Sequence, residues 1–276
     1  MPEMPEVETV RRGLVELVKG KTIEHVEVRY APIIDDDSQM FQTLLSDAKI
    51  IDIRRRAKFL IFDFDNGYSM ISHLRMEGKY QVRDNIDDFD KHVHIIFHFT
   101  DGSMLGYRDV RKFGRMKLVK TSEVLANKSL TKLGPEPLSP EFNFENIYPR
   151  IMRHKKSIKT VLLDQSVVSG LGNIYVDEVL WMSKIHPETS ANKLTKKDVQ
   201  NIIDASNEEI KTAIEAGGTT IRSYVDSRGN SGTFQLMLHA YDQEGQPCER
   251  CQTIIEKIKV GGRGTHFCPN CQKLVK

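Results

Sequence analysis

The sequence predicts a multidomain α+β protein: an N-terminal β-sandwich with flanking helices, a helical C-terminal domain, and a terminal β-hairpin module built around cysteines. Three observations predict this class. Short runs of alternating apolar and polar residues fill the first part of the chain, helical periodicity follows, and all four cysteines lie near the end. At 276 residues the chain is long enough for two domains and a small module.

The composition is that of an ordinary water-soluble protein, with 39% hydrophobic and 28% charged residues. No apolar run approaches the roughly 18 residues that a membrane span needs, so no membrane association is expected. The N-terminal segment is acidic and contains no apolar stretch, which argues against a signal peptide. We therefore expect a cytoplasmic protein with reduced thiols.

The N-terminal domain, residues 1–131, is expected to begin with an amphipathic helix over 5–19, where Val7, Val10, Leu14 and Leu17 recur at helical spacing. Strand-like runs follow at 22–30, 48–54, 58–64, 67–73, 92–99 and 115–119. In the clearest run, alternation places Val93, Ile95, Phe97 and Phe99 on one face and His92, His94 and His98 on the other. Asn66-Gly67 and Asp101-Gly102 suit hairpin turns.

A linker over 132–138 is expected because Gly134-Pro135-Glu136-Pro137 interrupts the pattern. A helical domain over 139–235 follows, with helical periodicity at 140–153, 157–165, 172–183 and 195–216. It ends in a loop over 217–235 that is rich in Gly, Ser and Thr. The cysteine module occupies 241–276.

Charge is unevenly distributed although the net charge is only +2. Basic residues concentrate at 106–120 and at 150–159, whereas acidic residues gather at 35–37 and 84–90. Such segregation can create a basic face that binds phosphates. On charge alone, solvated loops and helix faces explain the pattern equally well.

The spacing of the four cysteines predicts a zinc site. Cys248-x2-Cys251 and Cys268-x2-Cys271 are separated by 16 residues, and the segment between them is typical of a β-hairpin. Four thiolates complete a tetrahedral zinc shell and leave no open position, so the one Zn²⁺ ion would be structural. Disulfide bonds are the alternative, and a cytosolic chain disfavours them.

The N-terminus offers a candidate nucleophile. If Met1 is removed, Pro2 becomes a secondary amine, and an α-amino group has a pKa of about 7.7–8.0, so part of it is neutral near pH 7. Such an amine can attack a sugar C1′ atom, with Glu3 beside it as a general acid or base. On these residues alone, the better interpretation is that Pro2 merely starts the helix at Pro5. If Met1 is retained, the nitrogen is an amide and cannot react.

Three segments resemble the formamidopyrimidine-DNA glycosylases. The N-terminal stretch Met1-Pro2-Glu3-Met4-Pro5-Glu6-Val7-Glu8-Thr9-Val10-Arg11-Arg12-Gly13-Leu14 is similar to the start of that family, although Met4 replaces the commoner Leu. Gly170-Leu171-Gly172-Asn173-Ile174-Tyr175 resembles its helix–two-turns–helix element, and the cysteine tail resembles its zinc finger. The resemblance covers the whole chain and implies a bacterial, cytoplasmic protein, associated with the nucleoid during repair and monomeric.

The resemblance implies four catalytic residues. Pro2 would be the Schiff-base nucleophile and Glu3 the acid/base at the sugar. Lys58 would assist sugar opening and β-elimination, whereas charge alone would make it a phosphate-binding or solvated strand residue. Arg263 would grip the phosphates flanking the lesion, because its guanidinium meets phosphate bidentately, and would assist δ-elimination.

The resemblance also implies contacts to DNA. A base must leave the helix before its C1′ atom can be attacked, so the enzyme must fill the gap. Met76, Arg111 and Phe113 match the family's void-filling residues; as an alternative, Met76 and Phe113 could be core residues. Further DNA contacts are expected from His73, His92, Lys155 and Asn173, and lesion contacts from Glu77, Thr219, Ile221 and Tyr224. Without the resemblance, Asn173 would be an ordinary helix cap.

The resulting hypothesis is a bifunctional DNA glycosylase/AP lyase. It would excise oxidised purines, 8-oxoguanine and formamidopyrimidines, from double-stranded DNA and act on abasic sites, cleaving the strand by β- and δ-elimination. One alternative is an endonuclease VIII-like enzyme for oxidised pyrimidines; that class usually has Gly where this chain has Met4. The other is a non-catalytic zinc protein that binds damaged DNA.

Overall fold

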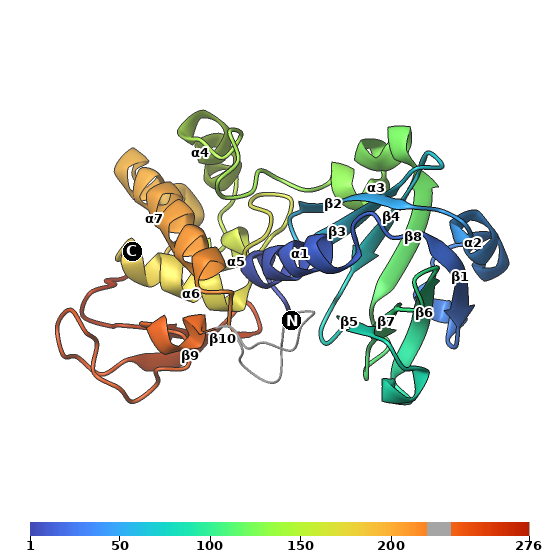
Figure 1. Cartoon of the computed structure of the whole chain (residues 1–276). Helices are drawn as coiled ribbons and strands as arrows, with labels where there is room; N and C mark the ends of the chain where they lie inside the picture. Colours follow the sequence, from blue (N-terminus) through green and yellow to red (C-terminus); the bar gives the residue numbers. More distant parts are fainter. Residues whose placement is uncertain (220–232, 276) are drawn as a thin grey trace. The chain divides into compact units, whose positions relative to one another are not determined.

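The computed structural model describes residues 1–219 and 233–275, which form two compact units (Figure 1). The first unit contains Met1–Thr131 together with 217–219 and 233, and the second contains Lys132–Ala216 together with 234–275. Every helix in these described ranges is too short or too polar to span a bilayer.

The first unit is built on two four-stranded antiparallel sheets, which confirms the expected β-sandwich. One sheet has the order β1-β6-β7-β5, with strands Ile23–Val28, Val93–Phe99, Met104–Arg108 and Lys79–Arg83. The other has the order β2-β3-β4-β8, with strands Ile50–Arg56, Phe59–Phe64, Tyr68–His73 and Arg115–Lys120. The core lies between the sheets, where Phe62 and Phe97 are both buried. The sequence did not predict β5 or β7, because both are short and carry Gly or charged residues.

Helices complete the first unit. Helix α1, Met4–Val18, packs its Val7, Val10 and Leu14 side chains into the sandwich core and contacts β2 and β3. A second helix, α2 over Ser38–Leu45, was not predicted; Phe41 and Leu45 bury one face of it, and Asp37 caps its start. The short elements are η1 Ala31–Ile33, η2 Ile86–Asp88, η3 Thr121–Ala126 and α3 Lys128–Thr131.

Strand β6 departs from the predicted alternation. Its pairing with β7 shifts register between Val93 and Ile95, so Val93 packs with Ile96 instead of with Ile95. Such a β-bulge reverses the facing of the residues on one side of it. The expectation that His94 lies on a polar face was therefore wrong: it is 4% exposed, and its Nε2 atom lies 2.9 Å from the backbone oxygen of Asp109.

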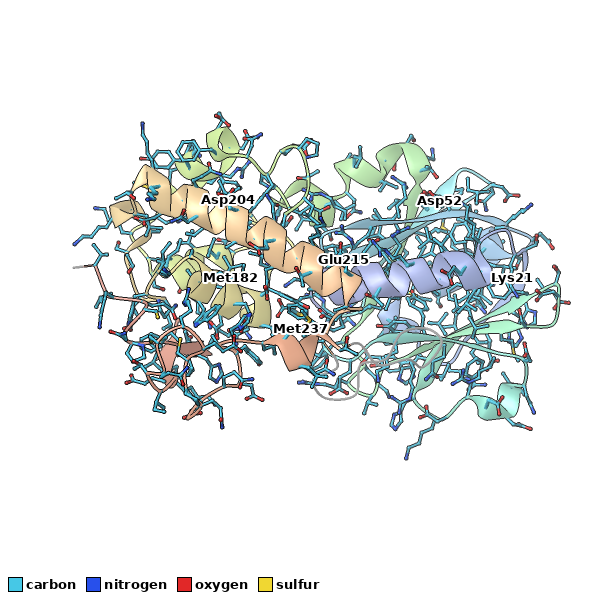
Figure 2. The ribbon with its side chains drawn as sticks, turned by 60° about the vertical axis from the view of Figure 1, so that its left-hand side comes forward. Lys21, Asp52, Met182, Asp204, Glu215 and Met237 are labelled. Carbon is cyan, nitrogen blue, oxygen red and sulfur yellow. The ribbon has the colours of Figure 1, made fainter. Side chains whose placement is uncertain are left out.

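The second unit contains the predicted helices. They are α4 Phe144–Met152, α5 Ile158–Leu162, α6 Asn173–Met182 and α7 Lys196–Glu215, with short turns η4 Ala191–Lys193 and η5 Phe234–Met237. Helix α7 packs on α6; Figure 2 labels Asp204 and Glu215 on α7 and Met182 at the end of α6. A capping box formed by Thr195 and Asp198 starts α7.

The C-terminal module forms the predicted hairpin from β9, Glu256–Val260, and β10, Arg263–Phe267. Its two-residue connection is Gly261-Gly262, and both glycines have positive φ, which is the backbone that tight hairpin turns require. Hairpin residue Phe267 is buried, as are Cys248 and Cys268, whereas Arg263 is exposed beside the turn.

Candidate active site

The N-terminal segment is buried and held by hydrogen bonds. Pro2 is buried and Glu3 is 3% exposed, directly before α1. The backbone nitrogen of Glu3 donates to Glu6 Oε2 at 2.8 Å, and Glu6 Oε1 accepts from the Thr219 backbone nitrogen at 2.8 Å and from its Oγ1 atom at 3.0 Å. One carboxylate therefore fastens the catalytic candidates and the start of the 217–235 loop to the same helix. Met1 precedes Pro2 here, so the Pro2 nitrogen is in an amide bond.

Lys58 lies in the turn between β2 and β3, next to Ala57, which has a left-handed backbone with φ of 49°. The Lys58 side chain is 5% exposed, which contradicts the alternative of a solvated residue. Arg55 supports this turn: its Nη1 atom donates to the Ala57 carbonyl at 3.0 Å, and its Nε atom donates to Glu8 Oε2 at 3.0 Å. Because Glu8 belongs to α1, this ion pair connects the turn that carries Lys58 to the helix that follows Glu3.

Glu8 is ionised despite its burial. Burial raises its pKa, but hydrogen bonds and charges from Arg11 and Arg55 outweigh this effect and lower the pKa to about 2. The carboxylate is therefore charged throughout the physiological pH range.

His73, at the end of β4, is a neutral imidazole. Burial, together with the charges of Arg75 and Lys58, lowers its pKa to about 3. The backbone nitrogen of Arg75 donates to His73 Nδ1 at 2.9 Å, so Nδ1 is an acceptor and the ring proton resides on Nε2. A neutral His73 can donate one hydrogen bond from Nε2, for example to a phosphate oxygen.

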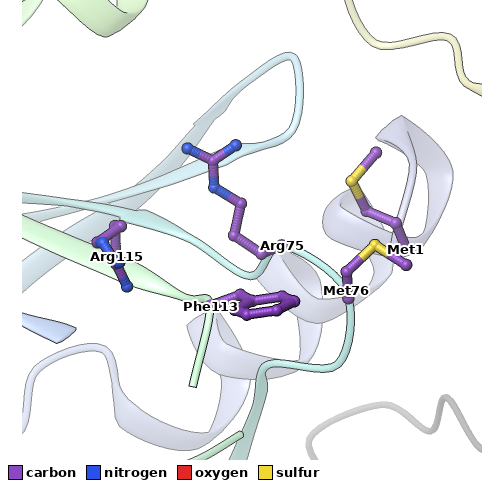
Figure 3. A pocket seen from close by; sticks show the side chains of 5 residues that line it. All are labelled: Met1, Arg75, Met76, Phe113 and Arg115. Carbon is purple, nitrogen blue, oxygen red and sulfur yellow. The ribbon is translucent and has the colours of Figure 1, made fainter. Parts of the chain in front are cut away.

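Two exposed apolar side chains stand at neighbouring turns of the first unit. Met76 is 41% exposed and Phe113 is 47% exposed, which contradicts the alternative that they are core residues. With Met1, Arg75 and Arg115 they line a pocket of ≈ 440 Å³. Figure 3 shows Met1 and Met76 on one side of Phe113 and Arg115 on the other. The Arg111 guanidinium lies 4.7 Å from the centre of the Phe113 ring, a cation–π contact.

The basic runs are less exposed than the sequence indicated. In the first run, Arg108, Arg115 and Lys117 lie within 4.0 Å of carboxylates of Asp90, Asp35 and Asp36. The acidic clusters that are separate in sequence therefore neutralise part of this run in space. In the second run Lys159 is completely buried, which contradicts its assignment to a basic face. Its Nζ atom pairs with Asp177 Oδ1 at 2.5 Å.

The buried Lys159 supports the hairpin turn next to Arg263. Lys159 Nζ donates to the Gly264 carbonyl at 3.1 Å, and Asn173 Nδ2 donates to the same oxygen at 2.9 Å. Asp177 Oδ2 accepts from the His266 backbone nitrogen at 2.9 Å. Lys159, Asn173 and Asp177, from α5 and α6, thus form hydrogen bonds with the backbone of β10. Arg263, at the start of β10, remains exposed. The sequence analysis placed Lys159 on the basic face and did not single out Asp177. The two residues are 18 positions apart on different helices, and only the packing of α5 against α6 brings them together.

The four cysteines form one cluster whose sulfur atoms all lie within 4.8 Å of one another. None of them is in a disulfide bond. This arrangement of two CxxC pairs suits a tetrahedral zinc ion, with no place for a fifth ligand or a substrate. Cys248, Cys251, Cys268 and Cys271 would therefore hold one structural zinc ion.

Comparison with known proteins assigns all three parts of the chain. Residues 1–116 match the formamidopyrimidine-DNA glycosylase N-terminal domain, 133–225 its H2TH domain, and 245–274 the zinc finger found in FPG and IleRS. The formamidopyrimidine-DNA glycosylase of Ligilactobacillus salivarius is 55% identical over 272 residues, covering 99% of both chains. That of Bacillus licheniformis is 54% identical over 275 residues, covering 99% of this chain and 100% of the relative. This chain belongs to the formamidopyrimidine-DNA glycosylase family.

Solved structures of this family have the same fold. A complex of the Lactococcus lactis enzyme with abasic-site DNA has a TM-score of 0.93 and 43% identity, covering 99% of this chain and 100% of the other. Its complex with DNA containing N7-benzyl-Fapy-dG has the same TM-score, identity and coverage.

The structure places most of the residues that the family resemblance indicated. Three candidates are buried in the first unit, namely Pro2, Glu3 and Lys58. Of the expected DNA contacts, four are exposed, two are half-buried and one is buried: Met76, Arg111, Phe113 and Lys155 are exposed, His92 and Asn173 are half-buried, and His73 is buried. The catalytic candidate Arg263 and the lesion-contact candidate Glu77 are exposed. Thr219 is bonded to Glu6, whereas Ile221 and Tyr224 lie outside the described residues.

Proposed function

We propose that this chain is a bifunctional DNA glycosylase/AP lyase that removes 8-oxoguanine and formamidopyrimidines from double-stranded DNA and then cleaves the strand. Family membership over the whole chain supports the glycosylase activity. The Lactococcus lactis relative was solved with abasic-site DNA and with DNA containing a formamidopyrimidine lesion, which supports abasic sites and formamidopyrimidines as substrates. The observation that carries the proposal is the buried Pro2-Glu3 segment at the start of α1, tied through Glu8 and Arg55 to the turn that carries Lys58.

The first step requires a free amine. Removal of Met1 exposes the secondary amine of Pro2, whose lone pair attacks C1′ of the damaged nucleoside while the C1′–N bond to the base breaks. Glu3 and Lys58 are suited to move the protons that this step needs, to the departing base and to the sugar ring oxygen. Ring opening then yields an iminium ion between Pro2 and C1′.

The second step uses the iminium ion as an electron sink. Loss of a C2′ proton to a base such as Glu3 expels the 3′ phosphate by β-elimination. A further proton loss, from C4′, expels the 5′ phosphate by δ-elimination. Hydrolysis of the remaining iminium ion by water regenerates the Pro2 amine and releases the sugar fragment as an aldehyde. Arg263 is exposed beside its hairpin turn, so its guanidinium is free of burial and suited to bind a phosphate bidentately. A zinc ion bound by the four cysteines would keep that hairpin folded.

Trapping with borohydride tests the proposal directly. Wild-type protein with Met1 removed should form a covalent adduct with 8-oxoguanine duplex, because hydride reduces the iminium ion to a stable amine. Peptide mapping should locate that adduct at residue 2. An adduct on Lys58 would refute the assignment of the nucleophile.

A matched control keeps the fold and removes only the amine. Protein that retains Met1 has an amide at Pro2, so it should bind lesion DNA with nearly the same affinity but give no adduct. Trapping by fully unprocessed protein, verified by intact mass, would contradict the mechanism.

A further inference from the structure

The turn between β7 and β8, residues 109–114, is called the wedge turn here because it carries Arg111 and Phe113. Its exposed side chains include Val110, Arg111 and Phe113. Its backbone is strained at Lys112, a non-glycine residue with φ of 57°. A short turn with a strained residue and exposed apolar side chains needs a specific support to keep one conformation.

Asp109 supplies this support. It is completely buried, and its two carboxylate oxygens accept from two different backbone nitrogens. Oδ1 accepts from Arg111 at 3.0 Å and Oδ2 from Gly114 at 2.7 Å, so the bonds enclose the segment that carries both candidate DNA contacts. The backbone oxygen of Asp109 also accepts from the Lys112 nitrogen at 3.2 Å. Since burying an unpaired carboxylate is unfavourable, these donors and this acid depend on one another.

The wedge turn also shares a support with the turn that carries Met76. The Tyr107 hydroxyl lies under both: a Cβ atom added to Gly78 would stand 2.2 Å from it, and one added to Gly114 would stand 1.7 Å from it. Both positions therefore require glycine. Within residues 1–219 and 233–275 this hydroxyl has no hydrogen-bond partner, so its contribution is steric. Tyr107 sets how closely the turns approach, whereas Asp109 sets the conformation of the wedge turn.

We propose that Asp109 is a positioning residue that determines selectivity for the base opposite the lesion, by holding Arg111 and Phe113 in one geometry. This inference rests on the proposed function and deepens it. Hydrogen-bond readout of a base needs its donor placed to within about 0.5 Å, and Arg111 is a long side chain that its own rotamers do not fix. The carboxylate bond at the Arg111 nitrogen and the Phe113 ring beside the guanidinium restrict it from two sides.

The variant Asp109→Asn tests this role. Its amide keeps one acceptor oxygen but turns an NH2 group toward the second backbone donor, so one of the two bonds is lost. We expect the ratio of 8-oxoguanine excision opposite cytosine to excision opposite adenine to fall by a factor of about five or more. The matched control is Asp101→Asn, at the other end of β7, where the aspartate likewise caps a turn by accepting from the Ser103 nitrogen. Its ratio should equal that of the wild type.

The outcomes separate the two proposals. If the wild type excises 8-oxoguanine with an opposite-base preference and folded Asp109→Asn retains the full preference, the positioning role of Asp109 is refuted. If the wild type shows neither excision nor a borohydride adduct, the proposed function itself fails. Should Asp109→Asn not fold, the same comparison is made in a Lys112→Gly background, where glycine removes the strain at φ of 57° without restoring the lost bond. If Asp109→Asn retains the full opposite-base preference in the Lys112→Gly background, the positioning role of Asp109 is likewise refuted.

Discussion

The indole Nε1 atom of Trp181 donates a hydrogen bond to Cys248 Sγ over 3.4 Å. The same indole stacks on the His239 ring at 4.4 Å and lies 3.7 Å from the Arg250 guanidinium. Trp181 belongs to α6, which begins at Asn173, so the cysteine cluster is packed directly on a helix of the H2TH domain. Because this is the chain's single tryptophan, its fluorescence reports on the zinc site.

Removing one cysteine should unfold the zinc finger. Cys268→Ser is expected to lose its stoichiometric zinc, because three thiolates bind the metal less tightly and metal binding provides most of the folding free energy of such a module. Trp181 emission should then shift as the neighbouring thiolate moves away. Affinity for lesion DNA should fall, since Arg263 is no longer positioned. Zinc content by atomic absorption and affinity by fluorescence anisotropy measure both effects; normal affinity in metal-free protein would contradict the prediction.

Glu8→Gln should weaken the first unit in a pH-dependent manner. Because the folded-state pKa is lowered from 4.5 to about 2, ionised Glu8 stabilises the fold above pH 4.5, and this contribution disappears as the pH falls toward 2. Its upper limit is about 3 kcal/mol at pH 7. Urea unfolding of wild type and variant should therefore differ most at pH 6–7 and less at pH 3. A difference independent of pH would indicate a packing effect, and exposed Glu123→Gln serves as the control.

Arg111→Ala should reduce opposite-base selectivity more than it reduces cleavage of an abasic site. A flipped lesion leaves its partner base with unpaired groups, and arginine offers only donors, which suit the O2 and N3 acceptors of cytosine. Excision of 8-oxoguanine should thus be faster opposite cytosine than opposite adenine by roughly 5- to 150-fold, and the variant should reduce this ratio. Single-turnover excision rates on the two duplexes measure this ratio. The control is Arg29→Ala, which removes an arginine that forms an ion pair with Glu27. If Arg111→Ala keeps the full ratio, another residue reads the base.

Glu209→Gln should stabilise the second unit at alkaline pH. Burial, with added repulsion from Glu178 and Glu208, raises the Glu209 pKa to about 8. A carboxyl whose folded pKa is raised contributes stability below its unfolded pKa of 4.5 and loses it as the pH rises through 8. Glutamine mimics the protonated carboxyl group, so the Tm of the Glu209→Gln variant should decline less between pH 5 and pH 8 than the Tm of the wild type. The variant Glu215→Gln, at an exposed position of the same helix, should follow the wild type. A decline of Glu209→Gln parallel to that of the wild type would disprove the assignment.

The features that the sequence predicted are encoded locally. Cysteine spacing specifies a four-thiolate site because each CxxC turn presents two ligands by itself, and the structure confirms the cluster. The helices and most strands were predicted from hydrophobic periodicity. The hairpins were predicted from Asn66-Gly67 and Asp101-Gly102, because glycine adopts the positive φ that the turns require at residues 67 and 102 without steric strain. Exposure of Phe113 amid basic residues was also predictable, since such a segment lacks the neighbours that would bury it.

What the tertiary structure alone decided depends on pairs that are distant in sequence. The burial of Lys159 follows from Asp177 on another helix, and the burial of His94 follows from a bulge that only the pairing of β6 with β7 reveals. The role of Asp109 as the support of the wedge turn is visible only in the folded structure, where its carboxylate accepts from two backbone nitrogens. The sequence by itself determined the family, the metal ligands and the order of the elements, because those signals are short-range. Which charges are buried was decided by folding, because a charge enters the interior only where the tertiary structure brings its partner to it.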